Sequence, residues 1–188
     1  MIKRVILSVV IVLTLINTSI AQSKYEVDNQ KSKLKVLGSS TMHDWDATAH
    51  EVFGKAEINV KNSEVEIHSL SFKLKGESLK SEKSGMEKDM YEALDTKQHP
   101  WIVYQFKKII GMEDGILSTS GTLTVAGTSK IMEIPVEVKK TTDEVTFMGE
   151  IAFKMSEFGI EPPTAVFGVL KTDDEVTVNF NIVYKVIQ

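Results

Sequence analysis

Apolar and polar residues alternate along most of this chain from residue 24 onward. A period of two is typical of β-strands that bury one face and expose the other. The two longest alternating segments have their apolar-face positions at Val145, Phe147, Gly149, Ile151, Phe153 and Met155, and at Val176, Val178, Phe180, Ile182, Tyr184 and Val186. Turn signals such as Glu113-Asp114-Gly115, Ala126-Gly127-Thr128 and Thr172-Asp173-Asp174 separate the segments. The pattern predicts an all-β chain that forms an antiparallel up-and-down barrel of about eight strands.

One segment departs from the alternation. Met90 and Leu94 lie four residues apart, Tyr91 and Leu94 lie three apart, and charged residues stand between them. That spacing is helical, whereas Pro100 blocks further helix and the alternation resumes at Trp101–Phe106. We therefore predict one short helix over Met86–Leu94, which closes one end of the barrel.

The first 21 residues have the features of a secretory signal peptide. Lys3 and Arg4 form a charged start, Val5–Ile16 is apolar, and Ser19-Ile20-Ala21 is a small-x-small cleavage site. The alternative is a membrane anchor, but the apolar segment is shorter than the roughly 20 residues that a spanning helix needs. The expected mature protein is a single domain over residues 22–188, with no permanent membrane anchor.

The composition excludes some classes of function and indicates how the fold is stabilised. The chain has a net charge of −4 and its basic residues are scattered among acidic ones, so nothing favours binding to nucleic acid. It has no cysteine, so stability has to come from burial rather than from disulfides. The composition suits a closed and well-packed fold.

We find no motif for a nucleophile, a phosphate loop or a zinc site. His43 and Asp44 are adjacent, so on a strand they would face opposite ways, and no two histidines have metal-ligand spacing. The sequence thus predicts no catalytic residue, no metal and no cofactor. An enzyme that uses His43 or His99 as an acid or base stays as an alternative.

Three segments are not required by strand patterning: residues 39–45, 99–101 and 158–168. The third is an apolar loop, and such a loop at a barrel mouth is a candidate gate or ligand contact. For Trp45 and Trp101 the alternative is plain core packing.

The lumen of an eight-stranded barrel either is filled by side chains or holds one slender ligand. Small residues at inward positions (Gly149, Ala47, Ala49 and Ala56) would leave room, although tight packing explains them equally well. We predict that the following residues line one continuous ligand-binding pocket: Trp45, Phe72, Phe106, Phe153, Met155, Phe158, Phe167 and Phe180.

Four blocks of the chain resemble the YceI-like family of exported, polyisoprenoid-binding barrels. They are the helix and following strand (MYEALDTKQHPWIVYQF), a hairpin (GTLTVAGTSKIMEIP), a strand ending in FGI (FKMSEFGI) and a closing strand (KTDDEVTVNF). The resemblance covers residues 24–187. Two departures stand out: Lys31 occupies a position where the family has His, and Met42-His43-Asp44-Trp45 resembles a subgroup rather than the better-known isoprenoid binders.

The resemblance implies a lipocalin-like barrel with an apolar tunnel, a periplasmic or secreted location, and an isoprenoid-tailed lipid or similar amphiphile as the partner. The expected function is therefore an exported binding or carrier protein. The alternatives are the lipid-modifying enzyme already mentioned and a structural or stress-related protein whose lumen is filled by side chains.

Overall fold

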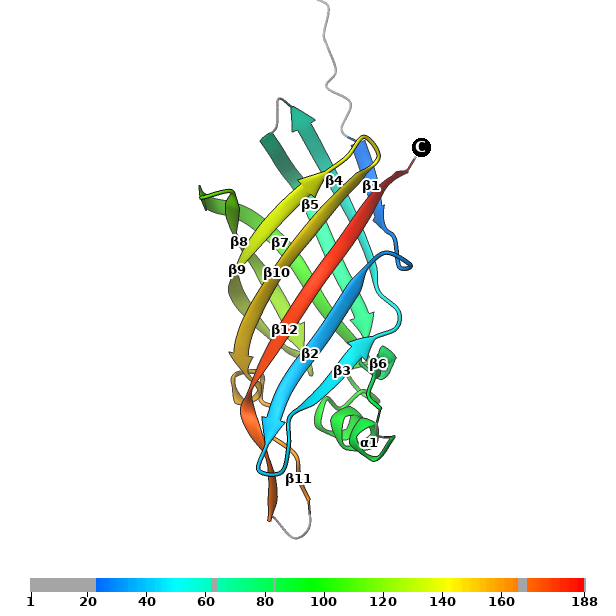
Figure 1. Cartoon of the computed structure of the whole chain (residues 1–188), viewed down its shortest axis with the longest axis vertical. Helices are drawn as coiled ribbons and strands as arrows, with labels where there is room; N and C mark the ends of the chain where they lie inside the picture. Colours follow the sequence, from blue (N-terminus) through cyan, green and yellow to red (C-terminus); the bar gives the residue numbers. More distant parts are fainter. Residues whose placement is uncertain (1–22, 62–63, 83, 166–168, 188) are drawn as a thin grey trace, which may run out of the picture.

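The computed structural model describes residues 23–61, 64–82, 84–165 and 169–187 (Figure 1). The predicted signal peptide and Phe167 lie outside these residues. The elements, in chain order, are β1 (Ser23–Val27), β2 (Lys33–Ser40), β3 (Trp45–Ala49), β4 (Phe53–Lys61), β5 (Glu64–Lys75), η1 (Gly76–Ser78), β6 (Leu79–Lys80), α1 (Ser84–Ala93), β7 (Trp101–Glu113), β8 (Ile116–Val125), β9 (Thr128–Lys140), β10 (Glu144–Lys154), η2 (Met155–Phe158), β11 (Thr164–Ala165) and β12 (Leu170–Ile187).

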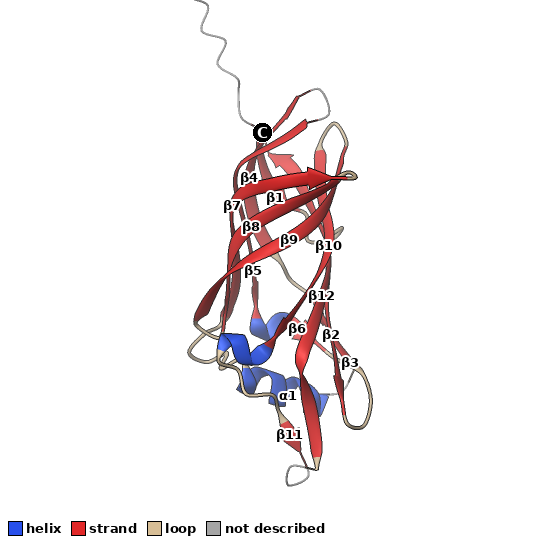
Figure 2. Ribbon diagram, turned by 90° about the vertical axis from the view of Figure 1, so that its left-hand side faces the viewer, coloured by secondary structure: helices blue, strands red, loops and turns tan. Residues whose placement is uncertain are grey.

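Eight strands form a closed antiparallel ring. The hydrogen-bonded order is β1, β4, β5, β7, β8, β9, β10 and β12, and β12 pairs back with β1. Successive strands from β4 onward are mostly neighbours in the chain, as an up-and-down barrel requires (Figures 1 and 2). The predicted all-β barrel with one short α-helix is confirmed.

The N-terminal strands complicate this simple order. β12 is long enough to pair with β1 near its C-terminal end, through Val27 and Tyr184, and with β2 along its other half. β2 then pairs with β3, and β3 with the two-residue β6. Figure 1 shows β2 and β3 beside the lower half of β12, next to α1. These strands continue the same sheet at the helix end of the barrel.

Two predicted hairpin turns are confirmed, and one predicted turn is wrong. Asp114-Gly115 and Ala126-Gly127 have consecutive positive φ angles of 49° and 82°, and of 46° and 76°, which suits two-residue hairpin turns. Thr172-Asp173-Asp174 instead lies within β12, at an irregularity in its pairing with β2. There the Asp174 carboxylate accepts hydrogen bonds from the Ser156 backbone N–H and hydroxyl, so polar side chains are accommodated without a turn.

The helix begins two residues before the predicted Met86 and ends one residue before the predicted Leu94. It packs across the lower end of the barrel (Figure 2). The Tyr91 hydroxyl ties it to β6, because it donates to the Leu79 carbonyl oxygen at 2.7 Å and accepts from Lys80 Nζ at 2.8 Å. Among the described residues α1 is the single α-helix, as predicted, and it lies at one end of the barrel.

Candidate functional site

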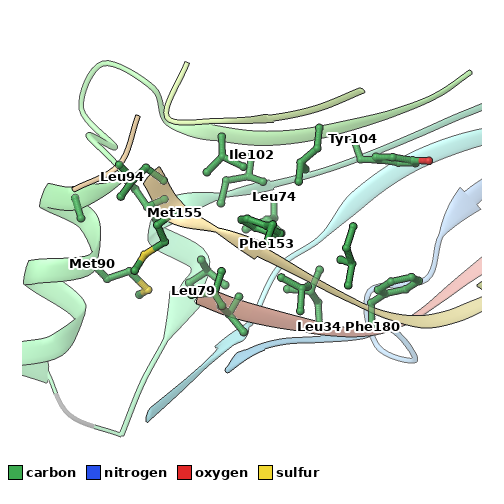
Figure 3. A pocket seen from close by; sticks show the side chains of 18 of the residues that line it. Leu34, Leu74, Leu79, Met90, Leu94, Ile102, Tyr104, Phe153, Met155 and Phe180 are labelled. Carbon is green, nitrogen blue, oxygen red and sulfur yellow. The ribbon is translucent and has the colours of Figure 1, made fainter. Parts of the chain in front are cut away.

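A cavity of about 570 Å³ occupies the interior of the barrel, a volume within the range of small-molecule sites. Aliphatic, aromatic and methionine side chains make up nearly all of its lining, and they come from most strands and from α1 (Figure 3). The predicted alternative of a lumen filled by side chains does not fit this cavity.

The side chains that line the cavity are those at the alternating apolar positions of the sequence. Consecutive inward positions of β12 all face the cavity, namely Val176, Val178, Phe180, Ile182 and Tyr184. Successive side chains of a strand point to opposite faces, so one strand presents one row of apolar groups to the lumen. β10 contributes Phe147, Ile151 and Phe153 by the same rule.

Of the eight predicted pocket residues, six line the cavity: Trp45, Phe72, Phe106, Phe153, Met155 and Phe180. Phe167 lies outside the described residues. Phe158 is not part of the lining, and this part of the prediction is wrong. Phe158 is buried against Val125 and Ile160, which do line the cavity, and its ring meets the Phe153 ring edge-on at 5.1 Å. The short helix η2 turns Phe158 away from the lumen, so it supports Phe153 from behind.

The small inward residues do not enlarge the cavity. A Cβ atom on Gly149 would lie 2.5 Å from the Pro135 carbonyl oxygen and 2.8 Å from the Phe180 ring, so Gly149 makes room for Phe180. Ala47 and Ala56 are buried in the main apolar core and do not line the cavity. These two alanines therefore serve tight packing of the core, which was the alternative interpretation of the small residues.

The cavity reaches the surface beside α1, at what we call the mouth. The exposed residues Met42, His43 and Lys171 line it there. Reciprocal hydrogen bonds between Thr41 and Lys171 hold the β2–β3 loop against β12. Sequence reasoning missed the contribution of the helix, which lines the mouth with Met86, Met90 and Leu94. The helical period of these apolar residues was the available signal.

The two histidines considered as catalytic groups lie in different places. His43 lines the mouth, with its Nδ1 atom 2.9 Å from the Asp44 carbonyl oxygen. His99 is outside the lining and packs against the β8–β9 turn, where a Cβ atom on Gly127 would lie 2.6 Å from the His99 ring. Within the described ranges, no cluster of three or more His, Asp or Glu residues could hold a metal ion.

The two tryptophans differ in environment. Trp45 faces the lumen, folds over Gly38 and donates from its indole N–H to the Ser39 carbonyl oxygen at 3.1 Å. Trp101 is neither in the cavity lining nor in the buried core. Its ring meets the Phe53 ring edge-on at 5.9 Å, and Lys73 Nζ lies 4.4 Å from its centre.

The end of the cavity far from α1, which we call the inner end, combines buried apolar side chains with three hydroxyls. Thr119 Oγ1 donates to the Ile134 carbonyl oxygen at 2.8 Å, and the Tyr184 hydroxyl donates to the Ser71 carbonyl oxygen at 2.9 Å. The Tyr104 hydroxyl is buried and has no hydrogen-bond partner among the described residues. Figure 3 shows this phenol oxygen pointing away from α1.

Burial raises the pKa of both inner-end tyrosines above the ordinary value, because it disfavours the phenolate. The neighbouring Thr119 hydroxyl counters part of this rise in the pKa of Tyr104, although the Tyr104 hydroxyl has no hydrogen-bond partner among the described residues. Both phenols are therefore neutral donors at neutral pH.

A family model for the YceI-like domain matches residues 25–184, and the chain belongs to this family. A search of curated proteins finds no match. No helix within the part of the chain that the structure describes is long and apolar enough to cross a membrane.

Several solved structures share the fold at low sequence identity. A structure of BcnA from Burkholderia cenocepacia has a TM-score of 0.69 and 17% identity, and the match covers 84% of this chain and 98% of that one. A polyisoprenoid-binding domain from Saccharophagus degradans, described as implicated in plant cell wall breakdown, has a TM-score of 0.68 and 12% identity, with 89% and 100% covered. The YceI protein of Campylobacter jejuni has a TM-score of 0.59 and 19% identity, with 72% and 82% covered.

Proposed function

We propose that this member of the YceI-like family is an exported carrier that holds the chain of a long amphiphile, such as an isoprenoid lipid, in its barrel. The observation that carries the proposal is the apolar cavity of about 570 Å³, which opens to the surface beside α1. The fold shared with a polyisoprenoid-binding domain supports an isoprenoid as the ligand class.

Burial of hydrocarbon alone is enough to retain such a ligand. Each methylene group removed from water contributes about 0.8 kcal/mol, so a dozen contribute roughly 10 kcal/mol before the entropy cost of binding. The lining supplies the matching apolar surface without any charged group deep in the lumen. Binding therefore needs no catalytic or metal chemistry.

The distribution of polar side chains supports an orientation with a polar headgroup at the mouth. His43, Asp89, Thr164 and Lys171 line the cavity there, close to solvent. A charged headgroup would keep its hydration at this position, whereas its burial at the inner end would be costly. Of the two histidines considered as catalytic groups, only His43 lines the cavity.

Export and a periplasmic or secreted location belong to the same proposal. They rest on the charged start, the short apolar segment and the cleavage site within residues 1–21. Material recovered from the periplasm or the medium should begin at Gln22 by N-terminal analysis. Protein that retains Met1 in a membrane fraction would contradict export.

The test of binding is mass spectrometry of an organic extract from the purified protein. We expect a long-chain lipid in the wild-type extract. Val178→Trp, which fills the lumen, should remove that lipid, whereas Asn181→Trp on the exposed face of the same strand should retain it. A folded wild-type protein that yields no lipid and binds no added long-chain amphiphile would disprove the proposed function.

A further inference from the structure

The inner end of the cavity has one hydrogen-bond donor that the protein leaves unused. The hydroxyls of Thr119 and Tyr184 are both committed to backbone carbonyl oxygens, at 2.8 and 2.9 Å. The hydroxyl of Tyr104, another residue that lines this cavity, is also buried and has no partner in the described part of the chain. Buried polar groups in folded proteins are nearly always paired, so this exception calls for an explanation.

Packing against the neighbouring strand, and no polar contact among the described residues, holds the Tyr104 side chain in place. A Cβ atom on Gly121 would lie 2.4 Å from both the Tyr104 ring and its hydroxyl oxygen, so glycine at this position of the neighbouring strand makes room for the whole phenol. The ring is thus held by packing while its hydroxyl projects toward the inner end (Figure 3). A phenylalanine would pack in the same way without leaving a polar atom unpaired.

We infer that the natural ligand carries a hydrogen-bond acceptor oxygen at its buried end, and that this oxygen accepts the proton of the Tyr104 hydroxyl. The inference rests on the proposed function and specifies its ligand class: a chain that ends in a carbonyl, ether or hydroxyl oxygen inside the barrel. Two kinds of molecule satisfy this chemistry. The first kind keeps its headgroup at the mouth and carries an oxygen near the end of its tail. The second kind enters headgroup first, so that a neutral oxygenated headgroup lies at the inner end.

The test compares wild type and Tyr104→Phe with three probes that displace a fluorescent lipid. The probes are a long-chain fatty acid, the same acid with a ketone on the penultimate carbon, and a neutral methyl ketone of the same length. The carboxylate keeps the two acids oriented with their heads at the mouth, because a buried unpaired charge is costly. The keto acid therefore tests an oxygen near the tail end, and the neutral ketone tests an oxygenated headgroup that enters first.

We expect Tyr104→Phe to weaken binding of at least one ketone about tenfold relative to the parent acid, since one buried hydrogen bond is lost. Tyr25→Phe is the matched control, because Tyr25 is also buried but does not line the cavity; it should leave the ratio between ketone and acid unchanged. An identical ratio in wild type and Tyr104→Phe for both ketones would overturn the inference and leave lipid binding intact. Failure of all three probes to bind wild type would overturn the proposed function as well.

Infrared spectroscopy on wild type gives a second measurement that does not depend on a variant. A carbonyl that accepts a hydrogen bond absorbs at lower frequency than the same carbonyl in a hydrocarbon solvent. A lowered carbonyl band for a bound ketone supports the inference. A band at the hydrocarbon value for both bound ketones contradicts it.

Discussion

The polar side chains at the two ends of the cavity differ in their exposure to solvent. At the mouth, polar side chains such as His43 and Lys171 are exposed, so water can satisfy them whether or not a ligand is present. At the inner end the hydroxyls are buried, and those of Thr119 and Tyr184 are satisfied by the backbone while that of Tyr104 is not. Under the proposed function, the mouth would accept many headgroups, whereas the inner end would select for one feature of the buried chain.

The largest expected effect comes from placing a charge between the two ends. Phe153→Asp removes the ring that meets Phe158 and leaves a carboxylate in the apolar lumen. We expect a loss of about 4 kcal/mol in the free energy of unfolding, together with loss of the bound lipid. Urea denaturation and mass spectrometry of an organic extract measure the two effects.

Ala152→Asp is the control for this variant, since Ala152 is exposed and precedes Phe153 on the same strand. It should retain both stability and lipid. Equal stability of Phe153→Asp and wild type would show that Phe153 is not in the apolar interior.

The second largest effect on stability is expected from removing a hydrogen-bonded hydroxyl at the inner end. Tyr184→Phe deletes the donor that pairs with the Ser71 carbonyl oxygen, and this carbonyl is then left without that partner. Since a buried unpaired group costs about 1–3 kcal/mol, urea denaturation should show a loss of that size. No loss of stability would mean that the hydroxyl is not committed to Ser71, and the contrast with Tyr104 would disappear.

Tyr104→Phe, the same substitution at the unsatisfied hydroxyl, should behave differently. It removes a buried group that pays a desolvation cost without forming a hydrogen bond. We expect the stability of the lipid-free protein to stay the same or to rise by up to about 1 kcal/mol. A loss as large as that of Tyr184→Phe would show that Tyr104 has a structural partner.

The smallest effect is expected at the mouth. Lys171 lines the cavity but is exposed, so its attraction for an anionic headgroup is weakened by solvent. Lys171→Ala should weaken binding of a fatty acid only about twofold, and added salt should remove that difference. Binding of a neutral long-chain alcohol provides the control and should not change. A large, salt-independent loss would mean that the mouth is as selective as the inner end.

The sequence by itself determined the class of the fold and much of the lining. Strict alternation along residues such as Val176, Val178 and Phe180 places every second side chain on the lumen face, whatever the neighbouring strands are. The helical spacing of Met90 and Leu94 likewise identified the helix that borders the mouth. Local periodicity is enough for such assignments because backbone geometry alone fixes which face a residue occupies.

Only the tertiary structure decided which residues stand behind the lining and which polar groups are paired. Phe158 was expected in the pocket, but η2 turns it behind Phe153, and Gly149 accommodates the Phe180 ring rather than a ligand. The contrast between Tyr104 and Tyr184 is likewise invisible in the sequence, where both are inward-facing tyrosines on strands. Their difference depends on whether a backbone carbonyl from another strand comes within hydrogen-bonding distance of the hydroxyl, and that distance is set by how the whole barrel closes.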